Sequence, residues 1–204
     1  MNTNDELREC IKRQRKYASF FDWNKKDEKE LGIVETLFES MKLQGINTFQ
    51  NLRISQKDPP DCIAEDQSGN LIGLEVSEFV DEEAVRFNAQ GKDVYRDWAI
   101  DEIVKKLEII ITEKDSKTFH GGPCKKLILV IHTDEFVINF QTLKPILEIH
   151  EFKKTNQITK AYLLFSYDPE ISHFPYIQLK IATTGHDNHV TTGIFQKTKL
   201  LQIE

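Results

Sequence analysis

Residues 59–80 read PPDCIAEDQSGNLIGLEVSEFV, and this stretch decides the fold. Two prolines break the chain, residues 62–65 are typical of a short strand, and a polar, glycine-containing loop leads into a second strand at 71–80. Because alternate residues of a strand share one face, Glu75 and Ser77 point to one side, and their apolar neighbours point to the other. The stretch therefore predicts a β-hairpin that carries a glutamate inside an otherwise apolar strand.

The same reasoning applies outward from the hairpin. Hydrophobic periodicity and turn residues predict the following elements: helix 27–42, strand 49–55, helix 94–114, strand 127–132, helix 142–153, and strands 161–166 and 176–181. The order is helix, three strands, helix, strand, helix and two strands, which is typical of an α/β or α+β sandwich with a mixed sheet. A basic helix at 5–18 is also expected, either solvated or in contact with nucleic acid.

Length and composition favour one globular domain. The chain has 204 residues with 13 phenylalanines, enough apolar material for a core. We expect a single domain over 1–204, with an N-terminal helical segment (1–26), a core (27–133) and a C-terminal extension (134–204) that extends the sheet or supplies an interface. No apolar run approaches the roughly 20 residues of a membrane span, so no membrane partner is expected.

Charge and cysteine content narrow the function classes. The net charge of −6 argues against a polybasic nucleic-acid binder, but it suits an acidic site in which a metal meets the phosphate. Cys10, Cys62 and Cys124 are odd in number and widely separated, which indicates a reducing, cytoplasmic setting. The sequence has no P-loop, dinucleotide-binding, nucleophile-elbow or zincin motif.

The hairpin gathers the candidate acidic residues. Asp61 enters the first strand and Glu75 lies within the second, so pairing of the strands brings two carboxylates together. Such carboxylates repel each other unless a divalent cation or a basic group neutralises them. Glu35 lies at helical spacing between Leu31 and Phe38, on or beside the apolar face of helix 27–42, and either points toward the same pair or has a basic partner of its own.

This layout resembles the PD-(D/E)XK nuclease-like superfamily, also called restriction-endonuclease-like. The resemblance covers residues 27–133, in the core order α-β-β-β-α-β. Pro60-Asp61 and Glu75-Val76-Ser77 resemble the family motif, and Glu35 resembles the glutamate often carried on its first core helix. The resemblance implies phosphodiester hydrolysis in DNA or RNA with Mg²⁺ or Mn²⁺, with Asp61, Glu75 and the carbonyl of Val76 as metal ligands.

One motif position departs from the family, because Ser77 stands where the family has a lysine. A serine hydroxyl can hold a water but supplies no positive charge. Either a basic residue of the following segment substitutes (Lys92, Arg86 or Arg96), or a second metal does, or catalysis is lost. The leading hypothesis is therefore a divalent-metal-dependent nuclease that acts as a monomer or a homodimer. The alternative is a catalytically inactive nuclease-fold module that binds nucleic acid or a partner protein.

Plainer interpretations remain for these residues. Asp61 suits a turn, Glu75 suits the wet face of a sheet, and the whole chain suits an unrelated α/β domain with surface acids. Asp58 is an alternative to Asp61 as a ligand, but its position two prolines away suits a cap or turn residue. Glu78 faces away from Glu75 and is excluded as a ligand. Two weaker candidates are the loop 186–189, with two histidines, and His132, at the end of a buried strand.

Overall fold

The computed structural model describes residues 25–92, 94–119, 124, 126–135 and 137–182. The expected segments 5–18 and 186–189 lie outside these residues. The described elements are α2 (Lys26–Leu43), β1 (Phe49–Ile54), β2 (Cys62–Asp66), β3 (Leu71–Glu78), α3 (Glu82–Ala89), α4 (Ile100–Ser116), β4 (Lys126–His132), α5 (Phe140–Leu147), β5 (Glu151–Phe152), β6 (Ile158–Leu164) and β7 (Tyr176–Ile181). The chain is therefore a mixed α/β protein.

The strands form one mixed sheet of seven, in the order β1-β2-β3-β4-β6-β7-β5. β1, β2 and β3 form an antiparallel meander, as the hairpin pattern predicts. β3, β4 and β6 are parallel to one another, and β7 returns antiparallel to β6. The C-terminal segment thus extends the sheet, which was one of the two roles expected for it.

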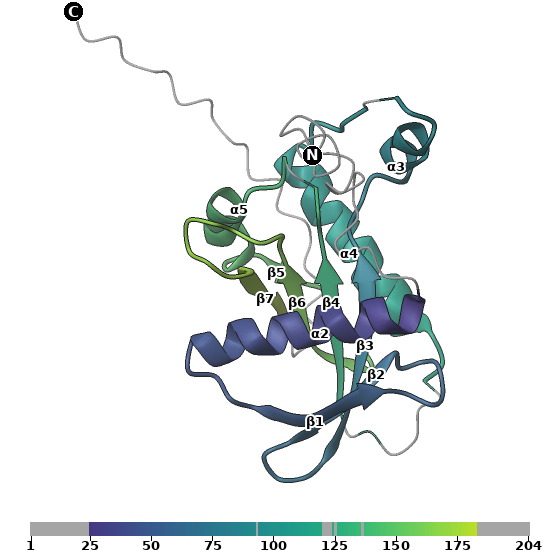
Figure 1. Ribbon diagram of the computed structural model, residues 1–204, viewed down its shortest axis with the longest axis vertical. Coiled ribbons are helices and arrows are strands. Elements are labelled where there is room, and N and C mark those ends of the chain that lie inside the picture. The colour runs from purple at the N-terminus through teal and green to yellow at the C-terminus, as the bar shows by residue number, and fades with distance from the viewer. Residues whose placement is uncertain (1–24, 93, 120–123, 125, 136, 183–204) are drawn as a thin grey trace, which may run out of the picture.

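Helices cover both faces of the sheet, and each face has its own core. α2 crosses one face (Figure 1) and packs Ile33 and Leu37 against residues of β2, β3 and β4 such as Leu74. α4 and α5 cover the other face, where Leu107 packs with Leu129. Burial of this apolar area is the main stabilising term for the domain. None of the helices in the described ranges is long and apolar enough to cross a membrane.

Three expectations from the sequence are corrected. α4 begins at Ile100 and not at 94, because the Glu102 carboxylate accepts a hydrogen bond from the Ala99 N–H and fixes the start there. α3 was not expected; Asp81 caps it by accepting from two backbone N–H groups of its first turn. The helix expected over 142–153 ends at Leu147, and Pro145 lies in its second turn rather than its first.

Candidate metal site

The β2–β3 hairpin brings Asp61 beside Glu75. Cys62 pairs with Leu74, so the next position along each strand places Asp61 next to Glu75. β3 runs on past the start of β2 there, and the Val76 N–H donates to Asp61 Oδ2 at 2.7 Å instead of to a strand partner. Both carboxylates are buried, with 7% of Asp61 and 4% of Glu75 exposed. The interpretation of Glu75 as solvent-facing, and of both residues as surface acids, is therefore wrong.

Asp58 joins the two buried carboxylates. One oxygen from each of Asp58, Asp61 and Glu75 lies within 4.8 Å of the others, so the three form an acidic cluster. The loop is closed by the Ser55 N–H, which donates to the Asp61 carbonyl at 2.9 Å, and Asp58 is exposed at its rim. Asp58 is thus more than a turn residue, because the two prolines after it return the chain to the hairpin.

The cluster is electrostatically strained. Burial raises the pKa of Asp61 to about 7; the Val76 N–H opposes this shift, whereas the nearby charge of Glu75 adds to it. Glu75 Oε2 is buried and has no hydrogen-bond partner within the described residues. A buried carboxylate oxygen without a donor is costly, and a cation would satisfy it. The cluster therefore has the burial and the oxygen donors with which a divalent cation could be held.

A lysine from α4 reaches the cluster. Lys114 Nζ donates to Glu75 Oε1 at 2.6 Å and to the Val76 carbonyl at 2.9 Å. The sequence did not predict this contact, because Lys114 lies 39 positions beyond Glu75. A signal was present: Lys114 continues the i, i+4, i+7 spacing of Ile103, Leu107 and Ile110, which places it on the sheet-facing side of the helix.

The three basic residues predicted to substitute for the motif lysine make other contacts. Lys92 lies over the Phe87 ring at 5.0 Å, and Arg86 pairs with Glu83 at 3.5 Å. Arg96 is held by Asp81 and Glu102 at 3.0 and 2.9 Å. α3 and the segment after it lie beyond the carboxyl end of β3, away from the hairpin (Figure 1). The structure therefore brings Lys114, and not these residues, to Glu75.

Glu30, rather than Glu35, is the glutamate of α2 that faces the cluster. The buried stripe of α2 runs through Ile33, Leu37 and Met41, which leaves Glu35 exposed. Five helical residues rotate a side chain by about 140°, so the two glutamates cannot share a face. Glu30 lies one turn before Ile33, and its charge helps to raise the pKa of Asp61. Glu35 therefore does not lie on the apolar face; it is exposed beside it, between buried Val34 and Thr36.

A cleft of about 290 Å³ lies beside the cluster. Its lining includes Glu30, Ser77 and Lys114, together with Lys26 and Lys29 near the start of α2. Lys26 also lies 3.1 Å from Glu30 and 3.8 Å from Asp58, so the cleft and the cluster are continuous. The lysines of the cleft therefore lie next to the acidic cluster, whose three carboxylates do not themselves line the cleft.

His132 lines the same cleft from the end of β4. Burial lowers the pKa of His132 to about 3, and the nearby charge of Lys29 adds to this shift. The imidazole is therefore neutral at physiological pH. Glu78 also lines the cleft, but it pairs with Lys29 at 3.2 Å and is not part of the acidic cluster, as expected from its position in β3.

Comparison with known proteins gives no relative for this chain. No family model matches it, no curated protein matches its sequence, and no solved structure matches its fold. Any functional assignment therefore depends on the residues of the site.

Proposed function

We propose that the protein is a divalent-metal-dependent nuclease of the PD-(D/E)XK type, in which Lys114 of α4 replaces the motif lysine. The observation that carries the proposal is the convergence of Asp61, Glu75 and Lys114 at the point where β3 runs past β2. The element order α2-β1-β2-β3-α4-β4 supports the restriction-endonuclease-like core, with α3 as an insertion after β3.

Asp61, Glu75 and the Val76 carbonyl would hold Mg²⁺ or Mn²⁺, with Asp58 and Glu30 as additional acidic groups. The cation would polarise a phosphoryl oxygen and lower the pKa of a water molecule. The unpartnered Oε2 of Glu75 supports this assignment, because carboxylate oxygens are the ligands that these hard cations prefer.

The remaining groups of the cleft act on the substrate. The Lys114 ammonium, which contacts Glu75, would orient the attacking water and offset the negative charge that develops on the phosphate. Lys26 and Lys29 border the cleft and can meet the nucleic-acid backbone. The hydroxyl of Ser77 can hold a water there, and Lys92, which lies elsewhere, has no role in this mechanism.

The test is cleavage of end-labelled single- and double-stranded DNA and RNA with Mn²⁺. We expect metal-dependent cleavage of one of these substrates. Glu75→Gln should lower its rate by at least about 100-fold, because it removes a charged ligand without changing the shape of the side chain. Glu35→Gln, on the exposed side of α2, is the matched control and should keep the rate. Full activity of Glu75→Gln would rule out this mechanism.

One observation favours the inactive-module alternative. The ion pair between Lys114 and Glu75 neutralises the buried carboxylate without any metal. A module of this kind would bind nucleic acid or a partner at the cleft and would not cleave. Binding of labelled nucleic acid that is insensitive to Mn²⁺ and to Glu75→Gln would favour it over the nuclease.

A further inference from the structure

A second hollow, of about 230 Å³, lies at the amino ends of β4 and β6. It shares no lining residue with the cleft beside Glu75. Its floor is formed by Ile72 and Ile128, which belong to the core on the α2 side of the sheet. Its properties are therefore independent of the acidic cluster.

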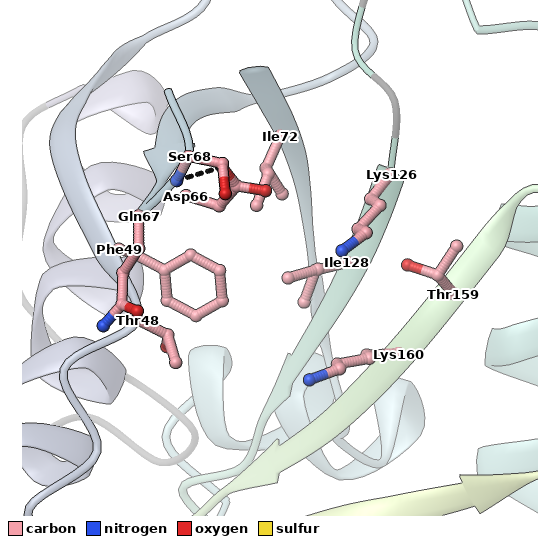
Figure 2. A pocket seen from close by; sticks show the side chains of 10 residues that line it. All are labelled: Thr48, Phe49, Asp66, Gln67, Ser68, Ile72, Lys126, Ile128, Thr159 and Lys160. Carbon is pink, nitrogen blue, oxygen red and sulfur yellow. Dashed lines mark hydrogen bonds between the residues drawn. The ribbon is translucent and has the colours of Figure 1, made fainter. Parts of the chain in front are cut away.

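One wall of the hollow is an aromatic ring held in place. Phe49 stacks on Phe38 with ring centroids 4.7 Å apart and planes at 16°. Figure 2 shows the Phe49 ring projecting into the hollow, with Ile72 and Ile128 across from it. A fixed ring beside an apolar floor suits a flat apolar group, because such a group can pack there without ordering a mobile side chain.

The opposite wall carries two lysines from adjacent strands. Lys126 pairs with Ile72 and Lys160 pairs with Ile128 in the sheet register, so both lysines border the apolar floor. Neither forms an ion pair within the described residues, whereas the neighbouring Lys180 pairs with Glu151 at 3.3 Å. Figure 2 shows both ammonium groups turned toward the side where Phe49 stands. Two lysines without an ion pair favour an anion there, and the charge of Lys126 also helps to lower the pKa of Asp66.

The one carboxylate of the hollow is engaged in its own turn. Asp66 accepts hydrogen bonds from the Ser68 N–H and the Asn70 N–H, both at 2.9 Å, and from the Asn70 amide. The Asn70 side chain and backbone lower the pKa of Asp66. Asp66 therefore fixes the β2–β3 turn and does not pair with either lysine.

We propose that this hollow binds one nucleotide, with the base against Phe49 and the phosphate between Lys126 and Lys160. A simple anion leaves the ring and the floor unused, and an apolar ligand leaves the two lysines unused. Aromatic stacking combined with lysine contacts is how proteins bind single nucleotides of a strand without reading sequence.

The test is calorimetric titration of the full chain with AMP, in EDTA so that no metal contributes. We expect a dissociation constant below about 1 mM, at least about 10-fold weaker binding of inorganic phosphate, and at least about 10-fold weaker AMP binding by the double variant Lys126→Gln/Lys160→Gln. Lys180→Gln is the matched control and should bind AMP normally. Glu75→Gln should also bind AMP normally, because it alters only the acidic cluster.

Other outcomes are decisive. Equal affinity for phosphate and AMP, unchanged AMP binding by the double variant, or no binding at about 5 mM AMP would each overturn the proposal. Phe49→Leu should weaken AMP but not phosphate, and this ratio does not depend on a small loss of stability. Titration with a single-stranded hexanucleotide distinguishes the source: tighter binding than AMP indicates a strand, and weaker binding indicates a free nucleotide.

Discussion

Two regions with buried carboxylates lie close together but are built in opposite ways. Asp115, 8% exposed, accepts hydrogen bonds from three consecutive backbone N–H groups, those of Asn156, Gln157 and Ile158, at 2.7, 2.8 and 3.0 Å. Asp61 accepts from one backbone N–H, and Glu75 leaves an oxygen without a partner among the described residues. The carboxylates thus have similar solvent exposure but very different hydrogen bonding, and Asp115 lies at a less deeply buried position than Asp61.

The difference separates a carboxylate whose oxygens are well satisfied from one whose oxygens are not. Burial alone would raise the pKa of Asp115, but its backbone hydrogen bonds outweigh burial and lower the pKa. The single donor to Asp61 does not outweigh burial, so the pKa of Asp61 rises. Asp115 ties the end of α4 to the start of β6, and its neighbour Lys114 reaches the acidic cluster. One turn of helix therefore both anchors the fold and serves the site.

The largest effect is expected from Lys114→Met. It should slow cleavage by about 100-fold or more, because it removes the charge that faces the phosphate. It should also tighten Mn²⁺ binding, because Lys114 Nζ contacts Glu75 Oε1 and the Val76 carbonyl, the atoms that we assign to the metal. Rates and calorimetry measure the two effects. Lys105→Met, exposed on the same helix, is the control; weaker Mn²⁺ binding by Lys114→Met would contradict the assignment.

Asp115→Asn should lower the free energy of unfolding by about 3 kcal/mol at pH 7, because an amide nitrogen would face backbone donors. The folded pKa of Asp115 is lowered, so its stabilisation is present above the unfolded pKa and is lost as pH falls through the folded value. Urea unfolding should therefore show a difference that shrinks below about pH 4. Asp101→Asn, exposed on the same helix, should change the free energy of unfolding little. Equal losses in both variants would show that the hydrogen bonds of Asp115 add no special stability.

Asp61→Asn should raise the free energy of unfolding, whereas Asp115→Asn lowers it. The folded pKa of about 7 lies above the ordinary 3.8, so the destabilisation by Asp61 is absent below pH 3.8, grows as pH rises from 3.8 to about 7, and is constant above that. This shift corresponds to at most about 4 kcal/mol. We expect a gain in stability of only about 1–2 kcal/mol at pH 8, because the weaker hydrogen bond between the amide oxygen and the Val76 N–H offsets part of the roughly 4 kcal/mol. At pH 4 we expect no gain. A loss of stability at pH 8 would show that the carboxylate is well satisfied.

The smallest effect separates the two glutamates of α2. Glu30→Gln should weaken Mn²⁺ binding about 5-fold, because it removes a charge near Asp61 without removing a direct ligand. Glu35→Gln should leave the affinity unchanged, since Glu35 is exposed on another face. Parallel titrations of the two variants measure this difference, and a larger effect of Glu35→Gln would return the role to that residue.

The parts of the fold that were predicted from the sequence depend on local pattern. The β2–β3 hairpin and the buried strand β4 follow from alternation, turn residues and a short apolar run, and the hairpin alone brings Asp61 to Glu75. The start of α4 was misplaced because Trp98, which packs on the core from outside the helix, extends the helical spacing. Local pattern cannot distinguish a core residue of a helix from one just before it.

The parts of the site that were missed depend on tertiary contacts. Lys114 reaches Glu75 from α4, 39 positions later in the chain. Asp58 comes close to Asp61 and Glu75 because the chain bends at the two prolines that follow it. Glu30 replaces Glu35 because the buried stripe of α2 is offset from Leu31 and Phe38, which are only half-buried. Each of these three placements depends on which side of a helix or loop packs against the sheet. The sequence of α2 allows two apolar stripes, and the sequence alone does not show which one is buried.

The most direct test of the central claim, a divalent-metal site at Asp61 and Glu75, is Mn²⁺ calorimetry without any nucleic acid. We predict one site in the natural protein, loss of that site in both Asp61→Asn and Glu75→Gln, and unchanged binding in Glu35→Gln, with folding of each variant checked by thermal melting. Absence of Mn²⁺ binding to the folded natural protein at millimolar metal would contradict a metal site at these residues, as would binding that survives both substitutions.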